Sequence, residues 1–178
     1  MSESRVLVSQ APLRRQYKAE PAAAMVTDHA VTTGQPPQDP FHNQVMPLPR
    51  TNVVVPVSIH SALGGPYDAP TSGDILCAAL ACCQDGTTRV VADLLGIAIE
   101  SISVEVKGDV DVRGTLAVDP SVPVGFQAMR CTVRLRVTPG PSARLLDKLR
   151  EQSERSCVIV QTLQHPPKVD VAYEIEVG

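Results

Sequence analysis

Alternation of apolar and polar residues predicts three strands in the second half of the chain. Within "IESISVEVKGDVDVRGTLAVD", Ile102, Val104 and Val106 keep one parity, which predicts a long strand over residues 99–119. The stretch "AMRCTVRLRVTPG" predicts a second strand, and "KVDVAYEIEV" over residues 168–177 predicts a third. In the second strand, one face carries Met129, Cys131, Val133, Leu135 and Val137, and the other carries Arg130, Thr132, Arg134 and Arg136.

Apolar residues three or four positions apart predict two helices around these strands. The first helix begins at Ser72 or Asp74, which are both suitable N-cap residues, and ends at Gly96. The stripe expected to pack against a sheet comprises Leu76, Leu80, Cys83, Thr87, Val90, Val91 and Leu94. The second helix is predicted over residues 141–157, with Pro141 near its start.

Prolines interrupt any regular pattern in the first 50 residues. The stretch "GQPPQDPFHNQVMPLP" disfavours a continuous helix or a central strand, because proline lacks an amide N–H, so an irregular arm is expected over residues 1–50. Within it, "PAAAMVTDHAVTTG" is compatible with a short helix beginning at Pro21 or with an edge strand. Residues 51–178 are expected to form one α+β domain, and "TNVVVPVSIHSA" at its start predicts a strand with Pro56 at an edge or bulge.

Composition narrows the classes of partner. The net charge is −3, aromatic residues make up 3% of the chain and tryptophan is absent, so we expect neither a nucleic-acid nor an anionic-membrane partner. The first residues, "MSESRVLVSQAPLRR", lack the apolar stretch of a secretion signal, and the longest apolar runs are far shorter than a membrane span. A cytoplasmic location is therefore predicted.

Five cysteines are the residues most able to carry chemistry. Three lie in "CAALACC", but paired short ligand spacings and a nearby histidine are missing, so we expect no metal and no other cofactor. Cys82 is turned about 100° from Cys83 on a helix, and neighbouring helical cysteines cannot bridge. Cys77 and Cys131 are interpreted as small buried hydrophobes. Cys83 and Cys157 both lie on core-facing sides of helices. Two interpretations therefore stay open: both are packed core residues, or they form a redox pair.

Three motifs resemble the OsmC/Ohr family of osmotically inducible and organic hydroperoxide resistance proteins. They are "GDILCAALACC", "VEVKGDVDVRGTLAVDPSVPVGFQAMRCTVRLRV" and "SERSCVIVQTL", and the likeness covers roughly residues 60–175. The resemblance implies an OsmC-like fold in which curved β-sheets pack on two central helices of an intertwined homodimer. It also places the active sites at the subunit interface.

The resemblance implies a thiol-dependent peroxidase. Cys83 would attack a small apolar hydroperoxide and Cys157 would resolve the sulfenic acid as a disulfide, which an external thiol reductant then reduces. Cys77, Cys82 and Cys131 would be dispensable for this chemistry. The alternative is a non-catalytic protein of the same fold that binds a small apolar ligand at the dimer interface.

Two features depart from the family's pattern around the reactive cysteine. The glutamate expected ten residues before it is Gly73 here, and the expected arginine is missing. Asp74 and His60 are the nearest candidates for a supporting role. The second motif reads "CVIV" in place of the usual C-P-V.

Overall fold

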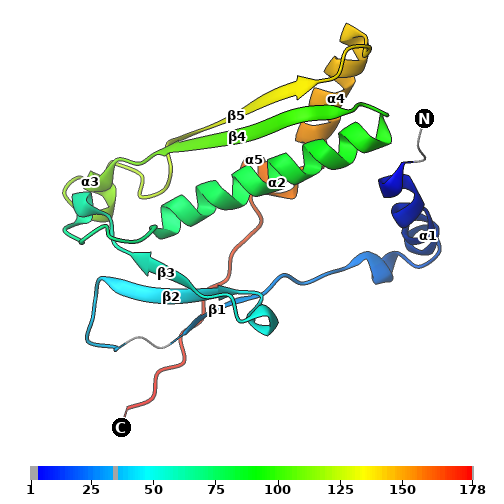
Figure 1. Ribbon diagram of the computed structural model, residues 1–178. Helices are drawn as coiled ribbons and strands as arrows, with labels where there is room; N and C mark the ends of the chain where they lie inside the picture. The colour runs from blue at the N-terminus through cyan, green and yellow to red at the C-terminus, as the bar shows by residue number, and fades with distance from the viewer. Residues whose placement is uncertain (1–3, 34–35, 178) are drawn as a thin grey trace.

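The computed structural model describes residues 4–33 and 36–177, which form two small antiparallel sheets around a long central helix (Figure 1). In chain order the elements are α1 (Arg5–Ala19), η1 (Pro21–Ala24), β1 (Ala30–Thr33), β2 (His42–Pro47), η2 (Pro49–Thr51), β3 (Val55–Ser58), η3 (Ser61–Leu63), α2 (Ser72–Leu94), β4 (Ile99–Asp109), α3 (Val112–Thr115), β5 (Ala128–Val137), α4 (Ala143–Ser156) and α5 (Val158–Gln164). The predicted α+β class is confirmed. One sheet has the order β1-β2-β3, and the other consists of β4 and β5.

Helix α2 organises the molecule, and its start is fixed by a capping box. Thr71 Oγ1 accepts a hydrogen bond from the Asp74 N–H at 3.2 Å, and the Asp74 carboxylate accepts one from the Thr71 N–H at 2.8 Å. The N-cap is therefore Thr71, and not Ser72 or Asp74, because only Thr71 has an acidic residue three positions on to complete the box. Gly96, with φ of +67°, ends the helix as predicted.

The core lies where α2, the β4–β5 sheet and α4 meet. Its buried residues are Val91, Ala92, Ile97 and Leu149, with Leu95, Ile99, Leu135, Val137 and Leu145 packed around them. On α2 the fully buried line runs through Leu80, Gln84, Thr88, Val91 and Ala92. This line is rotated by about one residue from the predicted stripe, because α2 packs against α4 and α5 as well as the sheet. Cys83 is consequently half-buried.

The prediction of an irregular N-terminal arm is wrong. Helix α1 spans 15 residues despite Pro12 within it, and its N-cap Ser4 accepts from the Leu7 N–H at 3.0 Å. Asp93 on α2 holds this end of α1, because its carboxylate accepts from the Ser4 hydroxyl and the Val6 N–H. The arm also supplies β1 and the central strand β2, which tolerates Pro47 because that residue is its last. Residues 21–33 combine both alternatives, a 3-10 turn followed by a strand.

Three differences concern the second half. The long strand predicted over residues 99–119 ends at Asp109, where the chain turns into α3, whose N-cap Asp111 accepts from the Arg113 N–H at 3.1 Å. Helix α5 was not predicted. The strand predicted over residues 168–177 is also wrong for the single chain, where this segment has no regular secondary structure. A strand without a neighbour has no ladder partner, so alternation alone cannot form one.

Among the described residues, α2 is also the one helix long and apolar enough to cross a membrane by length and composition. Core helices of water-soluble proteins meet the same criteria, so this finding assigns no membrane role. The homodimer and the cytoplasmic location remain predictions.

Candidate functional site

The structure brings Cys83 and Cys157 together although they are far apart in sequence. Cys83 lies in the middle of α2, and Cys157 lies at the junction between α4 and α5. The two thiols lie close enough that each shifts the pKa of the other. The Cys157 side chain has no exposed surface, whereas Cys83 is half-buried. Of the two interpretations that periodicity left open, this contact favours a redox pair.

Local backbone structure explains the position of Cys157. Leu149, Ser153 and Cys157 are spaced four residues apart, so they follow one face of α4, and all three are buried. At Cys157 the backbone becomes extended, with φ of −77° and ψ of 109°, and α5 begins at the next residue. The Cys157 carbonyl accepts the first α5 bond from Gln161 at 3.0 Å. The first N–H groups of α5 have no partners within the helix and remain available to the thiols.

These donors stabilise a thiolate on Cys83. Burial raises the pKa of Cys83, but hydrogen bonds from the Ile159 N–H, the Cys157 thiol, the Thr87 hydroxyl and the Val158 N–H outweigh it, so the pKa lies below its ordinary value. All four stabilising groups are neutral donors. The more exposed of the two sulfur atoms is therefore also the one more readily ionised.

Cys157 shows the opposite shift. Burial raises its pKa, and the hydrogen bond with Cys83 and the charge of Cys83 raise it further, with partial offset from the Val160 and Ile159 N–H groups. Of the two thiols, Cys83 is therefore the one that ionises first, and Cys157 is the one that keeps its proton to higher pH. A low pKa on Cys83 and a high pKa on Cys157 suit a pair of a nucleophile and a resolving thiol.

Thr87 is a residue whose role the sequence reasoning missed. Its spacing of one helical turn after Cys83 was the available signal, because side chains four residues apart on a helix are neighbours. The N–H groups of Val158 and Ile159 gave no such signal, since the interruption of the helix at Cys157 depends on how α4 and α5 pack.

Thr87→Val is expected to raise the pKa of Cys83 and to slow its alkylation by iodoacetamide at pH 7 by roughly two- to tenfold, the effect of one hydrogen bond. Because only the thiolate reacts, the alkylation rate rises with pH through the Cys83 pKa, and the variant curve should move to higher pH. Peptide mass spectrometry would follow Cys83 alone. Thr88→Val is the matched control, since the Thr88 hydroxyl donates to the Gln84 carbonyl at 2.8 Å. Equal curves for both variants would exclude the Thr87 role.

The supporting residues suggested by sequence do not contact the thiols. Asp74 belongs to the capping box at the start of α2. His60 accepts from the Ala62 N–H at 3.0 Å through Nδ1, and its ring lies against Tyr67 with centroids 4.3 Å apart. At Gly73, an added Cβ would lie 3.2 Å from the Phe126 ring. An aromatic ring therefore fills the space beside the position where the family carries a glutamate.

The other three cysteines lie apart from the pair. Cys82 is exposed, and its thiol donates to the Ala79 carbonyl at 3.3 Å. Cys77 is half-buried, and burial together with the Asp74 charge raises its pKa. Cys131 is exposed, so the prediction that it is packed is wrong for the single chain. Within the described ranges, no group of three or more His, Cys, Asp or Glu residues is placed to hold a metal.

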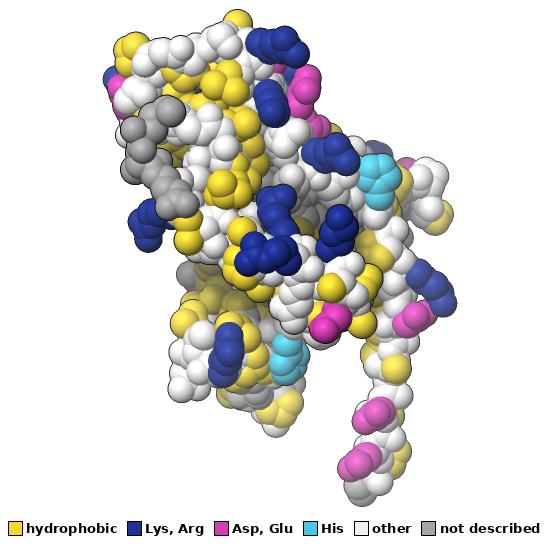
Figure 2. Space-filling view, turned by 90° about the vertical axis from the view of Figure 1, so that its right-hand side faces the viewer, with side chains coloured by type: hydrophobic (Ala, Val, Ile, Leu, Met, Phe, Trp, Pro, Cys, Tyr) yellow, Lys and Arg dark blue, Asp and Glu magenta, His cyan; other side chains and the backbone are white. Residues whose placement is uncertain are grey.

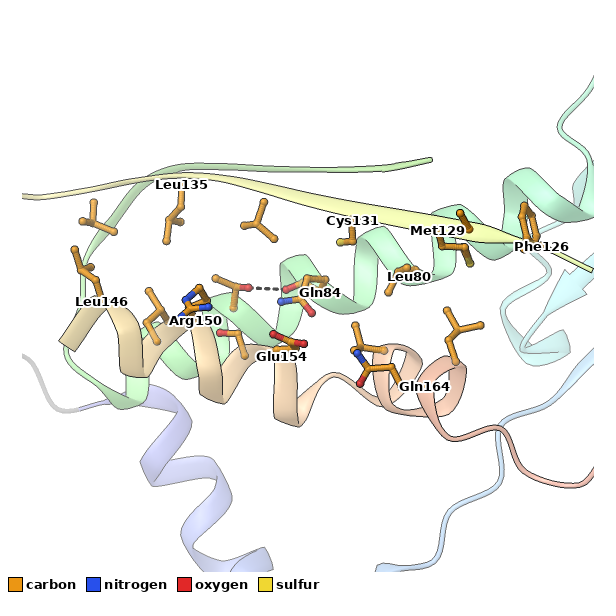
Figure 3. A pocket seen from close by; sticks show the side chains of 18 of the residues that line it. Leu80, Gln84, Phe126, Met129, Cys131, Leu135, Leu146, Arg150, Glu154 and Gln164 are labelled. Carbon is orange, nitrogen blue, oxygen red and sulfur yellow. Dashed lines mark hydrogen bonds between the residues drawn. The ribbon is translucent and has the colours of Figure 1, made fainter. Parts of the chain in front are cut away.

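Cys131 is exposed because it lines a large open groove between β5 and the helices, with a volume of about 1050 Å³ (Figure 3). The β5 side chains Met129, Cys131 and Leu135 point into it from one side, and α2, α4 and α5 form the other side. Neither Cys83 nor Cys157 lines it. The groove is therefore a feature separate from the thiol pair.

Comparison with known proteins identifies the family. The model of the OsmC-like protein family matches residues 64–172. The chain belongs to the OsmC-like family. No curated protein matches the OsmC-like chain at the sequence level.

Solved structures of this family share the fold at low sequence identity. An OsmC-like protein of Mycoplasma pneumoniae superposes with a TM-score of 0.63 at 12% identity, covering 79% of this chain and 89% of that chain. An organic hydroperoxide resistance protein of Elizabethkingia anophelis gives 0.58 at 17% identity, with 80% and 91% covered. OhrB of Bacillus subtilis gives 0.51 at 14% identity, with 80% and 94% covered. The OsmC-like fold is thus confirmed.

Proposed function

We propose that this OsmC-like protein is a thiol-dependent peroxidase that reduces organic hydroperoxides through Cys83 and Cys157. The observation that carries the proposal is the contact between the two thiols together with their opposite pKa shifts. Relatives of the same fold that are named organic hydroperoxide resistance proteins support it.

The reaction begins with attack by the Cys83 thiolate on the terminal oxygen of the hydroperoxide. A sulfur–oxygen bond forms, the oxygen–oxygen bond breaks, and the organic fragment leaves as an alkoxide that takes a proton to become an alcohol. Cys83 is now a sulfenic acid, which is neutral. Loss of the Cys83 charge removes one of the causes that hold the Cys157 pKa high, so Cys157 ionises more readily at this step.

Cys157 then attacks the Cys83 sulfur. The disulfide forms and the sulfenic oxygen leaves as water. An external thiol reductant returns the enzyme to its starting state by two thiol–disulfide exchanges. Because Cys157 has no exposed surface and Cys83 is half-buried, the reductant is proposed to attack the Cys83 sulfur.

The substrate class follows from the surroundings of Cys83. The neighbouring α5 residues Val158 and Ile159 are aliphatic, and the two turns of α2 before Cys83 are rich in alanine and leucine. An apolar wall favours a hydroperoxide with an organic group over hydrogen peroxide, because only the former gains from burying carbon surface.

Titration of free thiols tests the proposal. One equivalent of cumene hydroperoxide should remove two thiols per chain, and tryptic mass spectrometry should find them linked as Cys83–Cys157. The Cys82→Ser protein should lose the same two thiols. An unchanged thiol count would refute the peroxidase.

A non-catalytic protein that binds a small apolar ligand is the second candidate, favoured by one observation. Gly73 and the Phe126 ring occupy the region where the family's peroxidases carry a glutamate. If that carboxylate is required for reaction, the thiol count stays constant after peroxide addition. The same titration therefore separates the two candidates.

A further inference from the structure

The sequence does not by itself force the interruption between α4 and α5. Residues 143–164 contain neither proline nor glycine, yet the helix stops at Cys157 and restarts at Val158. The proline of the usual C-P-V motif would end α4 on its own, because it lacks an N–H and clashes with the preceding turn, whereas Val158 does neither. A contact beyond the local backbone must therefore hold the interruption.

The carbonyl of Glu154 shows what replaces the regular helix. In a continuous helix this carbonyl would accept a hydrogen bond from the N–H four residues on, which is that of Val158. Here it accepts from the Cys157 N–H at 3.4 Å and from the Gln161 side-chain Nε2 at 3.3 Å. The Gln161 amide thus takes the acceptor that the Val158 N–H would otherwise use.

The backbone of Gln161 contacts the same junction. Its N–H donates to the Cys157 carbonyl at 3.0 Å, which is the first hydrogen bond of α5. The Gln161 Nε2 also donates to Gln164 Oε1 at 3.3 Å, so the amide is oriented from two sides. Gln161 therefore ties the last turn of α4 to the first turn of α5.

The N–H released at the interruption donates to the sulfur of Cys83. Helix α5 packs against α2 (Figure 1), and the Val158 and Ile159 N–H groups both donate to Cys83. Lysine and arginine side chains gather at the surface of the face shown in Figure 2, whereas the groups that stabilise charge on Cys83 are neutral donors. A neutral N–H acts only at hydrogen-bonding distance and in the right direction, so the backbone that carries it must be held in place.

We propose that Gln161 is a positioning residue for the Cys83 nucleophile: its side chain occupies the Glu154 carbonyl and so keeps the Val158 N–H free to donate to the Cys83 sulfur. The proposal rests on the proposed peroxidase only in that Cys83 is the nucleophile of that reaction. Without the Gln161 amide, the Glu154 carbonyl accepts from Val158, α5 continues α4, and Cys83 loses one donor.

Gln161→Met tests this role, because it removes the donor and keeps the length of the side chain. The pH curve for alkylation of Cys83 by iodoacetamide should move to higher pH, and the rate at pH 7 should fall roughly two- to tenfold, the effect of one lost hydrogen bond. Gln152→Met, the same substitution at an exposed position of α4, is the matched control and should keep the wild-type curve. Peptide mass spectrometry follows Cys83, and circular dichroism should show both variants folded. An unshifted Gln161→Met curve, or an equal shift in Gln152→Met, would overturn the proposal.

Val158→Pro tests whether Gln161 acts through the Val158 N–H. Val158 is 66% exposed and is the first residue of α5, where proline is tolerated, and Cys157 before it has the extended backbone that proline requires. Proline removes the N–H and prevents α5 from continuing α4, so Val158→Pro alone should also move the curve to higher pH. Adding Gln161→Met to this variant should change the rate at pH 7 by less than about 1.5-fold. A Gln161→Met shift of the same size in both backgrounds would contradict the proposed role.

The result can be told apart from that of the peroxidase test, because alkylation requires a thiolate but no peroxide. A Gln161→Met shift in a protein that keeps all its thiols after cumene hydroperoxide would support the positioning role and refute the peroxidase. An unshifted curve in a protein that forms the Cys83–Cys157 disulfide would refute the positioning role alone.

Discussion

Replacing Cys83 with serine is expected to lower the rate of cumene hydroperoxide reduction by about a thousandfold or more, to the background of the thiol reductant. Serine retains the size of the side chain, but its hydroxyl does not ionise near neutral pH, so the attacking thiolate is lost. Peroxide consumption with excess dithiothreitol, followed colorimetrically, measures the effect.

Cys157→Ser should behave differently, because it leaves the nucleophile in place. The variant should consume one equivalent of peroxide rapidly and accumulate the sulfenic acid on Cys83, which dimedone traps for mass spectrometry. Later turnover then depends on direct reduction of the sulfenic acid by the added thiol. Cys82→Ser is the matched control on the same helix, and it should keep the wild-type rate.

Two outcomes would contradict these roles. A Cys82–Cys157 linkage after mild oxidation would assign attack to the exposed neighbour of Cys83. Normal multiple turnover by Cys83→Ser would remove the thiol pair from the reaction altogether.

The spacing of apolar residues was sufficient to predict α2, β5 and α4, because each of these elements depends on residues that are close together in sequence. The predicted arginine and apolar faces of β5 match the structure, since alternation is a property of the strand itself. The arm was mispredicted because local proline counts do not show that Asp93, far along the chain, anchors α1. The C-terminal strand was mispredicted for the single chain because pairing requires a distant neighbour.

At the candidate site too, the sequence pattern predicted some features, and tertiary packing determined the others. Motif position and helical phase singled out Cys83 and Cys157, and the structure places these thiols in contact. The donors around Cys83 could not be predicted, because they are backbone N–H groups presented by the break between α4 and α5. The family's pattern has an arginine at such a site. Here, neutral donors lower the pKa of Cys83, so the absence of the family's arginine does not leave the thiolate unsupported.

Oxidation is expected to stabilise the protein against unfolding by about 4 kcal/mol. A Cys83–Cys157 disulfide closes a loop of about 74 residues, and the loss of chain entropy in the unfolded state predicts a gain of this size. The contact already present between the thiols means that α2 and the α4–α5 junction need little rearrangement to form the bond. Urea unfolding of the peroxide-treated and the reduced protein, monitored by circular dichroism, gives the difference.

Cys157→Ser is the control for this stability difference, because it keeps the nucleophile but cannot form the bond, so peroxide treatment should leave its urea midpoint unchanged. Cys82→Ser should retain the full difference. The gain has a functional consequence, since a disulfide that stabilises the fold is correspondingly harder to reduce, and the reductant must supply that free energy in each cycle. If the oxidised wild type instead unfolds at lower urea than the reduced protein, forming the bond must displace Cys157 from its buried position. That result would show that α5 moves during the catalytic cycle and would contradict the small rearrangement expected here.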